Sequence, residues 1–508
     1  MIKHYGGRTE LLTPLKPTDR TAIAKILTNV LPVHYTNARE ITELYEMYTG
    51  KHPILNRVKD IRPEINNKIV DNVCYEIAEF TIGYRAGEPI QYVKRGKEDD
   101  THNDLTSITK LNDLMIDVNR EPKDRELIEW LTVVGVGHKL GITSDEILDD
   151  DEDIDFTVPD PRNAFVVKDT IRKRPVLGVI IGEHVDEGKK TIQVWTNDKV
   201  YNGEMHDGGI DVLLEGGKDN PFETIPLFEY QNNPSMMGVF EPILPLQDAI
   251  NELSSSRVDN VQQIVQSIMV FINSDIDKEK FQELMAVGGL AIMGEPGLPA
   301  DVKIVGTELD EDGSQTHAEH LYQRALTIAG IPDRNASAGG NTGTAMEIGQ
   351  GWINAENRTR TFESMWIQSE RKFLKWVIGV LKSLKSDDYK PLEVNDIEIK
   401  FTRNKLANMM VKSQAMLNLL QGGIHPKIAI ASSMLFNDPE QTYMESERDG
   451  YLEKWKIDGP SVPTAAGKTP PLTNARAKGL HSVQDNFTKE ANVKEAPKPN
   501  QVREVGKY

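Results

Sequence analysis

The feature that most constrains the fold is a glycine-rich loop followed by a long segment without helix breakers. Residues 330–344 contain Gly339, Gly340 and Gly343, whose backbones reach conformations that other residues avoid. No proline occurs in residues 345–384, so this segment can form one helix of roughly 60 Å at about 1.5 Å per residue. A helix this long exceeds what an ordinary globular core needs. The pattern therefore predicts that the loop and the helix are a working part of the molecule.

The sequence also predicts how this helix begins and which face it buries. Thr344 is a plausible N-cap, and Glu347 three residues later completes a capping-box pattern. Apolar residues then recur at spacings of three, four and seven, at Ala355, Phe362, Trp366, Phe373, Val377 and Leu384. These spacings predict one continuous apolar stripe along the helix.

Composition excludes several classes of protein. The chain has 508 residues, of which 38% are hydrophobic and 27% are charged, and this predicts a soluble protein of two to four domains. No stretch approaches 18 consecutive apolar residues and the N-terminus lacks a signal-peptide core, so we expect no membrane association. The single cysteine, Cys74, excludes an internal disulfide framework and is expected to be buried packing.

The formal net charge is −19. A protein that grips nucleic acid usually has a basic surface, because neutralisation of phosphates supplies most of the affinity. This chain therefore either does not meet nucleic acid or meets it without holding it.

The pattern of the first 240 residues predicts helices followed by a β-rich module. Expected helices cover Thr18–Thr28, Tyr35–Tyr48, Glu64–Gly83, 104–118 and 121–137. A strand is expected at Glu88–Val93, and short β-rich runs separated by turns fill Phe156–Tyr230.

The second half predicts an excursion and a return. A helix is expected from Phe240 to Ile272. Arg257 lies on its apolar stripe, and we expect it either to extend its charged end to solvent, to pair with Asp248 or Asp259, or to lie at a subunit contact. Then follow a small α/β module over 273–313, with a helix at Lys278–Ala286 and strands at Gly288–Gly294 and Asp301–Val305, and a helix at Ser314–Ala329. After the long helix we expect a strand at Asp396–Thr402 paired with the earlier β module, helices at Asn404–Leu420, Lys427–Phe436 and Pro439–Trp455, and disorder beyond about Ile457.

No pattern in the chain supports catalysis or a metal site. The acidic run Asp145–Asp155 lacks the central glycine and the last glutamate of an EF-hand loop, and we interpret it as a solvated loop. His317 and His320 are three residues apart, whereas zinc-protease helices need a spacing of four. Walker loops and nucleophile elbows are absent too. We therefore predict no catalytic residues, no metal and no cofactor.

The order of these parts resembles the portal proteins, or head-to-tail connectors, of long-tailed bacteriophages. Three regions carry the resemblance: residues 48–90 with their Tyr-Thr-Gly-Lys-His-Pro and Gly-Tyr-Arg-Ala-Gly-Glu-Pro segments, the helix–module–helix excursion of 241–330, and the Gly-Gly-Asn-Thr-Gly-Thr-Ala loop before the long helix. The resemblance covers roughly residues 35–455. It implies a predominantly helical α+β subunit with a wing, a stem, a clip and a crown, which assembles into a ring.

The resemblance also implies a division of the chain and a set of site residues. The wing is 1–240 with a return strand in 385–405, the stem helices are 241–272 and 314–331, the clip is 273–313, the tunnel loop is 332–345, the tunnel helix is 346–384, the crown is 406–456, and 457–508 is a disordered tail. The tunnel loop includes Arg334, Asn335, Ser337, Gly339, Gly340, Asn341, Thr342 and Gly343, and the tunnel helix includes Glu347, Trp352, Phe362 and Trp366. The motor-facing clip includes Gly288, Gly289, Met293 and Glu295.

Implied partners are eleven further copies of the chain in a dodecamer, double-stranded DNA in the channel, the terminase large subunit, scaffolding and major capsid proteins, and a head-completion adaptor. The implied location is a capsid vertex of the virion, after assembly in the host cytoplasm. Two alternatives stay open: a phage head-morphogenesis enzyme, protease or nuclease, and a virion interaction protein without a channel.

Overall fold

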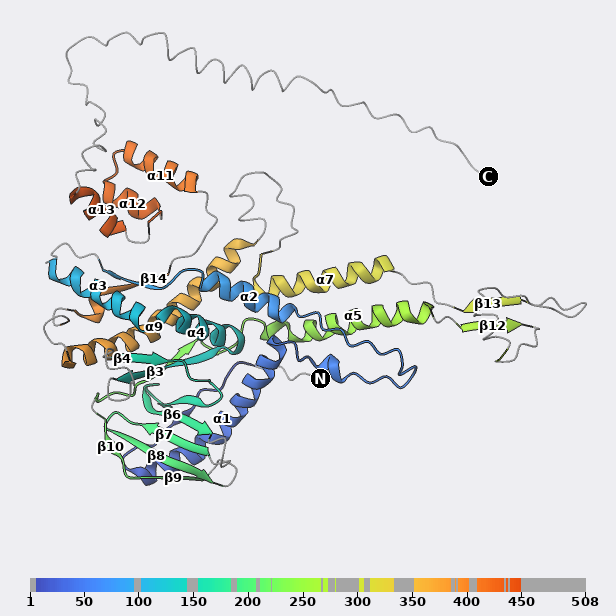
Figure 1. Cartoon of the computed structure of the whole chain (residues 1–508), viewed down its shortest axis with the longest axis horizontal. Helices are drawn as coiled ribbons and strands as arrows, with labels where there is room; N and C mark the ends of the chain where they lie inside the picture. Colours follow the sequence, from blue (N-terminus) through green and yellow to red (C-terminus); the bar gives the residue numbers. More distant parts are fainter. Residues whose placement is uncertain are drawn as a thin grey trace, which may run out of the picture.

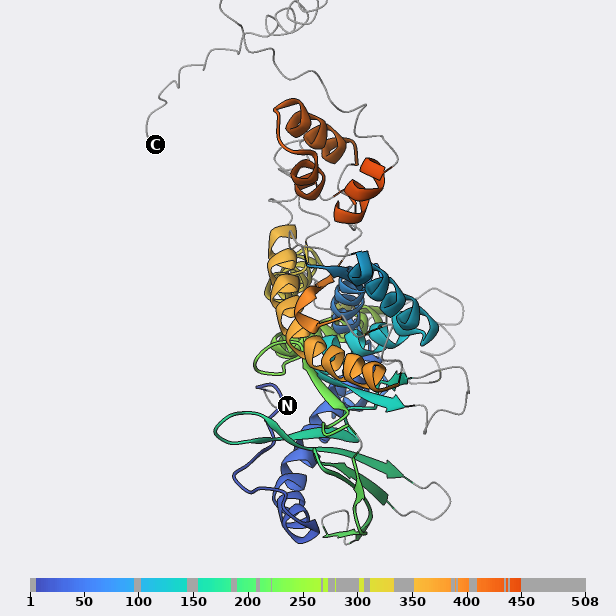
Figure 2. The same ribbon diagram turned by 90° about the vertical axis from the view of Figure 1, so that its left-hand side faces the viewer.

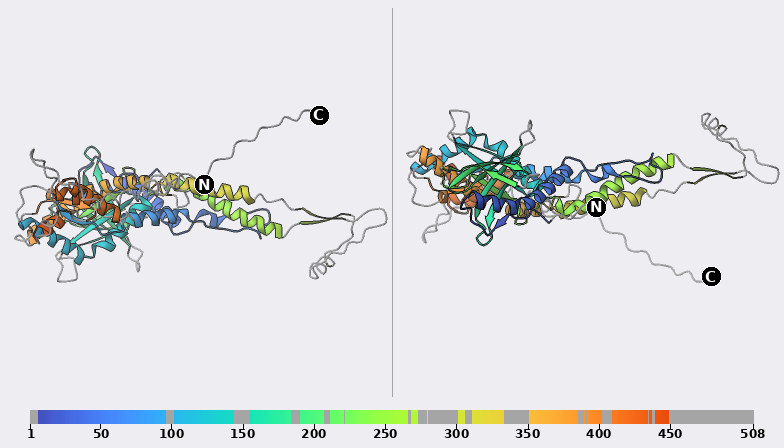
Figure 3. Two further views of the ribbon diagram at one scale, coloured as in Figure 1. Left: turned by 90° about the horizontal axis from the view of Figure 1, so that it is seen from above. Right: turned by 90° about the horizontal axis from the view of Figure 1, so that it is seen from below.

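The protein is elongated, with a broad body from which two helices project side by side (Figure 1). The computed structural model describes residues 6–95, 102–143, 154–183, 190–206, 211–220, 222–265, 268–272, 279, 301–305, 311–332, 351–384, 389, 392–401, 409–433, 435–436 and 439–448. Views from above and below show the same projection along the long axis (Figure 3). Its class is α+β, as the sequence predicted.

The N-terminal helix is a single element, α1 (Arg20–Tyr48), and the prediction of two short helices is wrong. Asp19 caps it by accepting hydrogen bonds from the amides of Thr21 and Ala22. Pro32 lies inside the helix and removes one backbone hydrogen bond. The helix nevertheless continues because its buried face packs against the body on both sides of the proline, and such packing outweighs local propensity.

Helix α2 (Val73–Arg85) begins nine residues later than predicted, with Asn72 as its N-cap. The segment before it is not helical, because its backbone amides donate hydrogen bonds to side chains of a projecting helix. The next elements follow the prediction closely: β2 (Gln91–Lys94), α3 (His102–Asp117) and α4 (Arg120–Val134). Cys74 is fully buried in α2, as expected.

The β module is confirmed, and it divides into two sheets. The larger runs in the order β1-β5-β6-β7-β8-β10, with β9 also paired to β8. Its strands are β1 (Leu12–Thr13), β5 (Ala164–Asp169), β6 (Pro175–Glu183), β7 (Lys190–Trp195), β8 (Lys199–His206), β9 (Asp211–Leu214) and β10 (Lys218–Asp219). Helix α1 covers one face of this sheet (Figure 2).

The smaller sheet has the order β11-β3-β4, formed by β3 (Val136–Thr143), β4 (Ile154–Thr157) and β11 (Leu227–Gln231). The sequence missed β3, because the apolar run of α4 continues into it; Gly135, with φ of 85°, ends the helix between them. The predicted return strand exists as β14 (Ile397–Lys400), but it pairs with β2 and not with the β module.

The projecting part consists of α5 (Leu244–Val265) and α7 (Glu311–Ala329), which join the antiparallel pair β12 (Ile268–Ile272) and β13 (Asp301–Val305). The prediction of one helix reaching Ile272 is wrong, since α5 ends at Val265 and Ile268 pairs with Val305 in a ladder. β13 is confirmed. The predicted strand at 288–294 and nearly all of the helix at 278–286 lie outside the described residues.

The long helix is α9 (Trp352–Leu384). It begins after Gly351, whose φ of 84° is outside the helical range, so a continuous helix from 345 is wrong. The stripe is buried from Ala355 to Val377, whereas Leu384 is 49% exposed at the end. Thr344 and Glu347 lie outside the described residues.

Three C-terminal helices form a group set apart from the body: α11 (Met409–Gln421), α12 (Pro426–Ser433) and α13 (Pro439–Arg448) (Figures 1 and 2). Each overlaps a predicted helix: α13 lies within it, whereas α11 ends one residue later and α12 begins one residue earlier than predicted. Residues 457–508 lie outside the described part of the chain.

Candidate channel-forming elements

Most residues predicted for the tunnel loop and the clip lie outside the described residues. This applies to Arg334, Asn335, Ser337, Gly339, Gly340, Asn341, Thr342, Gly343 and Glu347, and to Gly288, Gly289, Met293 and Glu295. The structure does describe the three remaining predicted residues, Trp352, Phe362 and Trp366, which all lie on α9. Trp352 opens the helix, 37% exposed, whereas Phe362 and Trp366 are buried against the body. The two inner aromatic residues therefore anchor the helix.

The centre of α9 is fastened to the body by a buried carboxylate that the sequence did not single out. Glu370 is 0% exposed and accepts hydrogen bonds from Tyr92 Oη (2.6 Å) and Tyr230 Oη (2.5 Å). Its oxygens also lie 2.9 Å from Arg120 Nη2 and 3.1 Å from Lys139 Nζ. These four partners come from β2, β11, α4 and β3, so one side chain ties α9 to four elements.

Asp124 completes the cluster and balances its charge. It lies 2.6 Å from Lys139 Nζ and 2.7 Å from Arg120 Nε. Burial raises the pKa of Glu370, but the two cations and the tyrosine hydroxyls outweigh burial and lower it to about 2. The cluster therefore holds two cations and two anions, and it is electrically neutral within the core. Removal of any one member leaves an unbalanced buried charge.

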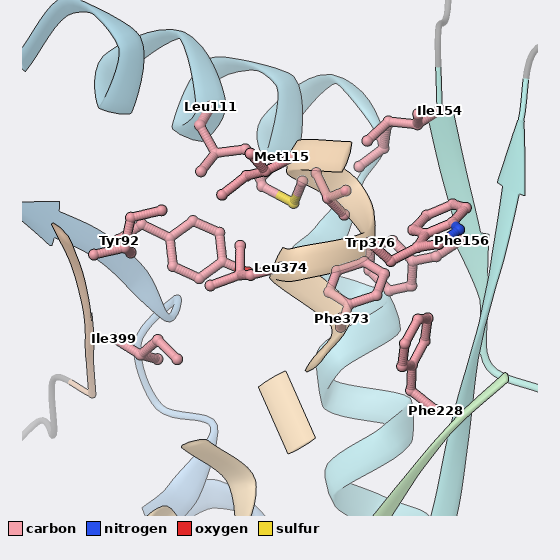
Figure 4. Packing of buried hydrophobic residues seen from close by; sticks show 14 of the residues in the cluster. Tyr92, Leu111, Met115, Ile154, Phe156, Phe228, Phe373, Leu374, Trp376 and Ile399 are labelled. Carbon is pink, nitrogen blue, oxygen red and sulfur yellow. The ribbon is translucent and has the colours of Figure 1, made fainter. Parts of the chain in front are cut away.

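Aromatic and aliphatic side chains of α9 and the surrounding elements pack together in the core (Figure 4). Phe373 of α9 lies between Phe156 and Phe228, with ring centroids at 5.2 and 5.6 Å in edge-to-face arrangements. The next turn places Trp376 directly over Gly141 of β3. A Cβ at Gly141 would lie 2.4 Å from the indole ring, so only glycine fits there.

The projecting helix α5 is held by a ladder of polar side chains at intervals of four residues. Gln247, Asn251, Ser255 and Asp259 are all buried. Their side-chain oxygens accept hydrogen bonds from the backbone amides of Cys74 (3.1 Å), Asp71 (2.9 Å), Ile69 (2.9 Å) and Asn67 (2.8 Å), respectively. We call residues 57–71, which lie along α5 and include a turn at Arg62–Ile65, the arm. Because α5 occupies the arm's amides, that segment is not helical.

At the outer end of the ladder Asp259 binds two cations of the arm. Its Oδ2 lies 2.9 Å from both Arg57 Nη1 and Lys59 Nζ. Burial raises the pKa of Asp259, but the Asn67 amide and Lys59 outweigh it and lower the pKa to about 2. Within the described residues Arg257 makes no ion pair with Asp259 or Asp248, so the pairing alternative is wrong, and the solvent-exposed and subunit-contact alternatives stay predictions. The contacts of the ladder could have been predicted from the sequence, because polar residues recur every four positions on α5.

The start of α9 is joined to the end of α7 by one arginine. Arg358 donates hydrogen bonds to the carbonyls of Ala329 (2.9 Å) and Ile328 (2.8 Å), which are among the carbonyls that a helix end leaves without intrahelical partners. Gly330 then turns the chain with φ of 75°, and a Cβ there would lie 2.4 Å from Arg358 Nε. The two helices thus meet at a tightly packed junction.

The described ranges contain no cluster of three histidine, cysteine or acidic residues able to hold a metal ion. No helix among them is both long and apolar enough to span a membrane. Most of the acidic run is undescribed, but Asp155 pairs with Lys123.

Comparison with known proteins agrees with this architecture. The model of the family "Phage portal protein, SPP1 Gp6-like" matches residues 28–454. The chain belongs to this family. It is also 22% identical over 404 residues to the portal protein of Bacillus phage SPP1, covering 73% of this chain and 74% of that protein.

Membership of the portal family confirms the resemblance drawn from the sequence. The match contains α5, β12, β13, α7 and α9, together with every residue of the Glu370 cluster and the α5 ladder. Portal-family proteins are structural components of the phage capsid, and this is consistent with the lack of a catalytic pattern in the sequence. The enzyme alternative is not favoured.

Proposed function

We propose that this chain forms a ring at one vertex of a phage capsid and that double-stranded DNA enters and leaves through the axis of the ring. The family match over residues 28–454 carries this proposal. The shape supports it, because a narrow two-helix projection on a broad body suits a wedge-like subunit repeated around an axis (Figure 1). We expect twelve subunits per ring.

The division of the subunit follows from the same proposal. Helices α5 and α7 serve as the stem, and β12 and β13 belong to the clip at its far end, where the terminase and later an adaptor dock. Residues 332–345 serve as the tunnel loop, α9 as the main part of the tunnel helix, and α11 to α13 as the crown. The body, with both larger sheets and the β2–β14 pair, serves as the wing that scaffolding and capsid proteins surround.

The charge of the chain suits a conduit. Each phosphate that a protein neutralises adds affinity, and affinity acts as friction on DNA that must slide. A net charge of −19 keeps such contacts few. We infer that the channel wall repels the duplex along most of its length and that the motor supplies the force for movement.

Electron microscopy of the purified full chain tests the ring directly. We expect rings with an axial hole, and particles that stay monomeric at all concentrations would refute the proposal. Deletion of residues 338–342 tests the tunnel loop separately. Rings should still form, because the deletion removes no residue of the Glu370 cluster or of the α5 ladder, while DNA packaging should fall; normal packaging would exclude a role for the loop.

A further inference from the structure

A cavity of about 260 Å³ lies where α2, the end of α7 and the start of α9 meet. Its wall includes Phe80, Tyr84 and Arg85 of α2, Asn232, and Arg358 and Thr359 of α9. A water molecule occupies about 30 Å³ of liquid, so the space is large enough for a small hydrated ligand. Two of the residues in its wall, Arg85 and Arg358, carry guanidinium groups.

Arg85 differs from the other buried arginines of this chain. Arg8 lies 3.1 Å from a carboxylate oxygen of Glu241, and Arg120 is paired with both Asp124 and Glu370. Arg85 is just as buried, at 7% exposed, but the described residues provide it with no ion pair. Its partners are neutral.

The contacts of Arg85 leave part of its guanidinium unused. Nη1 donates to Asn232 Oδ1 (2.8 Å) and lies 3.4 Å from Thr132 Oγ1, while the group stacks 4.0 Å above the Phe362 ring. Its Nε is buried without a hydrogen-bond partner. Burial lowers the pKa of Arg85 to about 9, Glu363 opposes this through space, and Arg358 adds to it. An isolated buried charge is costly unless an anion balances it.

Arg358 brings a second cation to the same wall. Its two hydrogen bonds go to helix-end carbonyls, and within the described part of the chain it too has no carboxylate in ion-pair contact. The nearby Glu356 is already engaged, since it accepts a hydrogen bond from Tyr84 and pairs with Arg360. The described residues that line the cavity therefore include two arginines and no carboxylate.

We propose that this cavity is a binding site for an oxyanion, a phosphate or a carboxylate, held between Arg85 and Arg358. Guanidinium groups bind both anions through charge-assisted hydrogen bonds, and Arg85 and Arg358 both line the cavity. The anion comes either from solution, as free phosphate, or from an acidic side chain of a second copy. By joining α2 to α9 beside the end of α7, it would stiffen the junction between the projection and the body. The site does not depend on the DNA-channel function.

Calorimetric titration of the full chain with inorganic phosphate at constant ionic strength tests the site. Dissociated subunits should bind phosphate saturably. Arg358→Gln should weaken binding about ten- to a hundredfold, the usual effect of losing one charged hydrogen bond. Arg360→Gln is the matched control, because Arg360 lies on the same helix, two residues away, with its side chain 65% exposed. It should bind phosphate as the unchanged chain does.

The source of the anion follows from a second titration, on assembled rings separated by size. If rings also bind phosphate, the ligand is free anion. If only subunits bind, a carboxylate of a neighbouring copy fills the site, and Arg358→Gln should then weaken ring assembly while Arg360→Gln does not. Absence of saturable binding to subunits, or equal binding by both variants, overturns the proposal. Either result leaves the ring and channel proposal unaffected, because phosphate binding does not require packaging.

Discussion

Replacement of Glu370 by glutamine tests whether the buried charge cluster fastens α9. Glutamine keeps the size of the side chain but removes its charge, so Arg120 and Lys139 are left with Asp124 alone. The cluster then has a net charge of +1 in a site where Lys139 is 0% exposed. Breaking a buried ion pair in this way costs about 3–5 kcal/mol. With a urea m-value of about 3 kcal/mol/M, the unfolding midpoint should fall by about 1–2 M.

Tryptophan fluorescence during urea unfolding is a suitable assay. Trp366 is buried on the same helix, and its ring lies 5.0 Å from that of Tyr230, one of the hydrogen-bond donors to Glu370. Glu398→Gln is the control, since Glu398 is an exposed residue on β14 and its loss should change stability by less than about 0.5 kcal/mol. Equal stability of the Glu370→Gln and Glu398→Gln variants would refute the reasoning.

A double mutant separates charge balance from hydrogen bonding. Lys139→Met alone leaves a net charge of −1, and Glu370→Leu alone leaves +1. Together they leave the neutral Arg120–Asp124 pair. The double mutant should therefore lose markedly less unfolding free energy than the two single mutants lose in sum. Additive losses would mean that charge balance is not what the cluster provides.

Acid should reduce the effect of Glu370→Gln. The pKa of Glu370 is about 2 in the folded protein and about 4.5 in the unfolded chain. A carboxylate with a depressed pKa stabilises the fold above the unfolded value, and this contribution disappears as pH falls. The stability difference between the unchanged chain and the variant should therefore be full at pH 6 and shrink from pH 4.5 towards pH 2.

Asn251→Leu removes one rung of the α5 ladder, so hydrogen exchange of the arm amides should accelerate roughly ten- to a hundredfold while the rest of the body is unchanged. Gly330→Ala should destabilise the protein by at least about 1 kcal/mol, because φ is 75° and the added Cβ meets a guanidinium, whereas Gly83→Ala, with nothing within 4 Å, should not. Burial lowers the pKa of His34 and of His138 to about 4, so thermal stability should decline as pH falls from 6.5 to 4, by about 1.4 kcal/mol per pH unit for each histidine at most; His138→Leu should reduce that slope by up to half.

The spacing of apolar residues in the sequence predicted most of the helices and strands and many of the residues that they bury. The stripe through Phe362, Trp366 and Phe373 lies where it was predicted, and so do the β module, β13 and most helices. Glu370 was not found, although it lies four residues after Trp366 and three before Phe373, and thus on the stripe itself. A charged residue at such a position signals a buried partner, but its partners lie 140 to 278 residues away in the sequence.

The arm shows why another prediction was wrong. Ile65 and Ile69 continue the apolar spacing of α2, and local pattern alone favours a helix there. The deciding interactions are long-range, since the amides of Asn67, Ile69 and Asp71 donate to α5 nearly two hundred residues later in the sequence. A helix would bond some of these amides internally and leave the polar stripe of α5 buried without partners. In the observed structure the amides of the arm and the side-chain oxygens of α5 provide each other with hydrogen-bond partners.

The two fastening points on α9 have a mechanical consequence. Arg358 holds the end of α7 and Glu370 holds the body, and twelve residues of helix span roughly 18 Å between them. Apolar contacts alone allow a helix to slide by small repacking steps, whereas the paired charges of the Glu370 cluster hold its members in one geometry. A displacement of the projecting helices must therefore either move α9 as a rigid lever or break the Arg358 contacts, because the Glu370 cluster is the more costly of the two to disrupt.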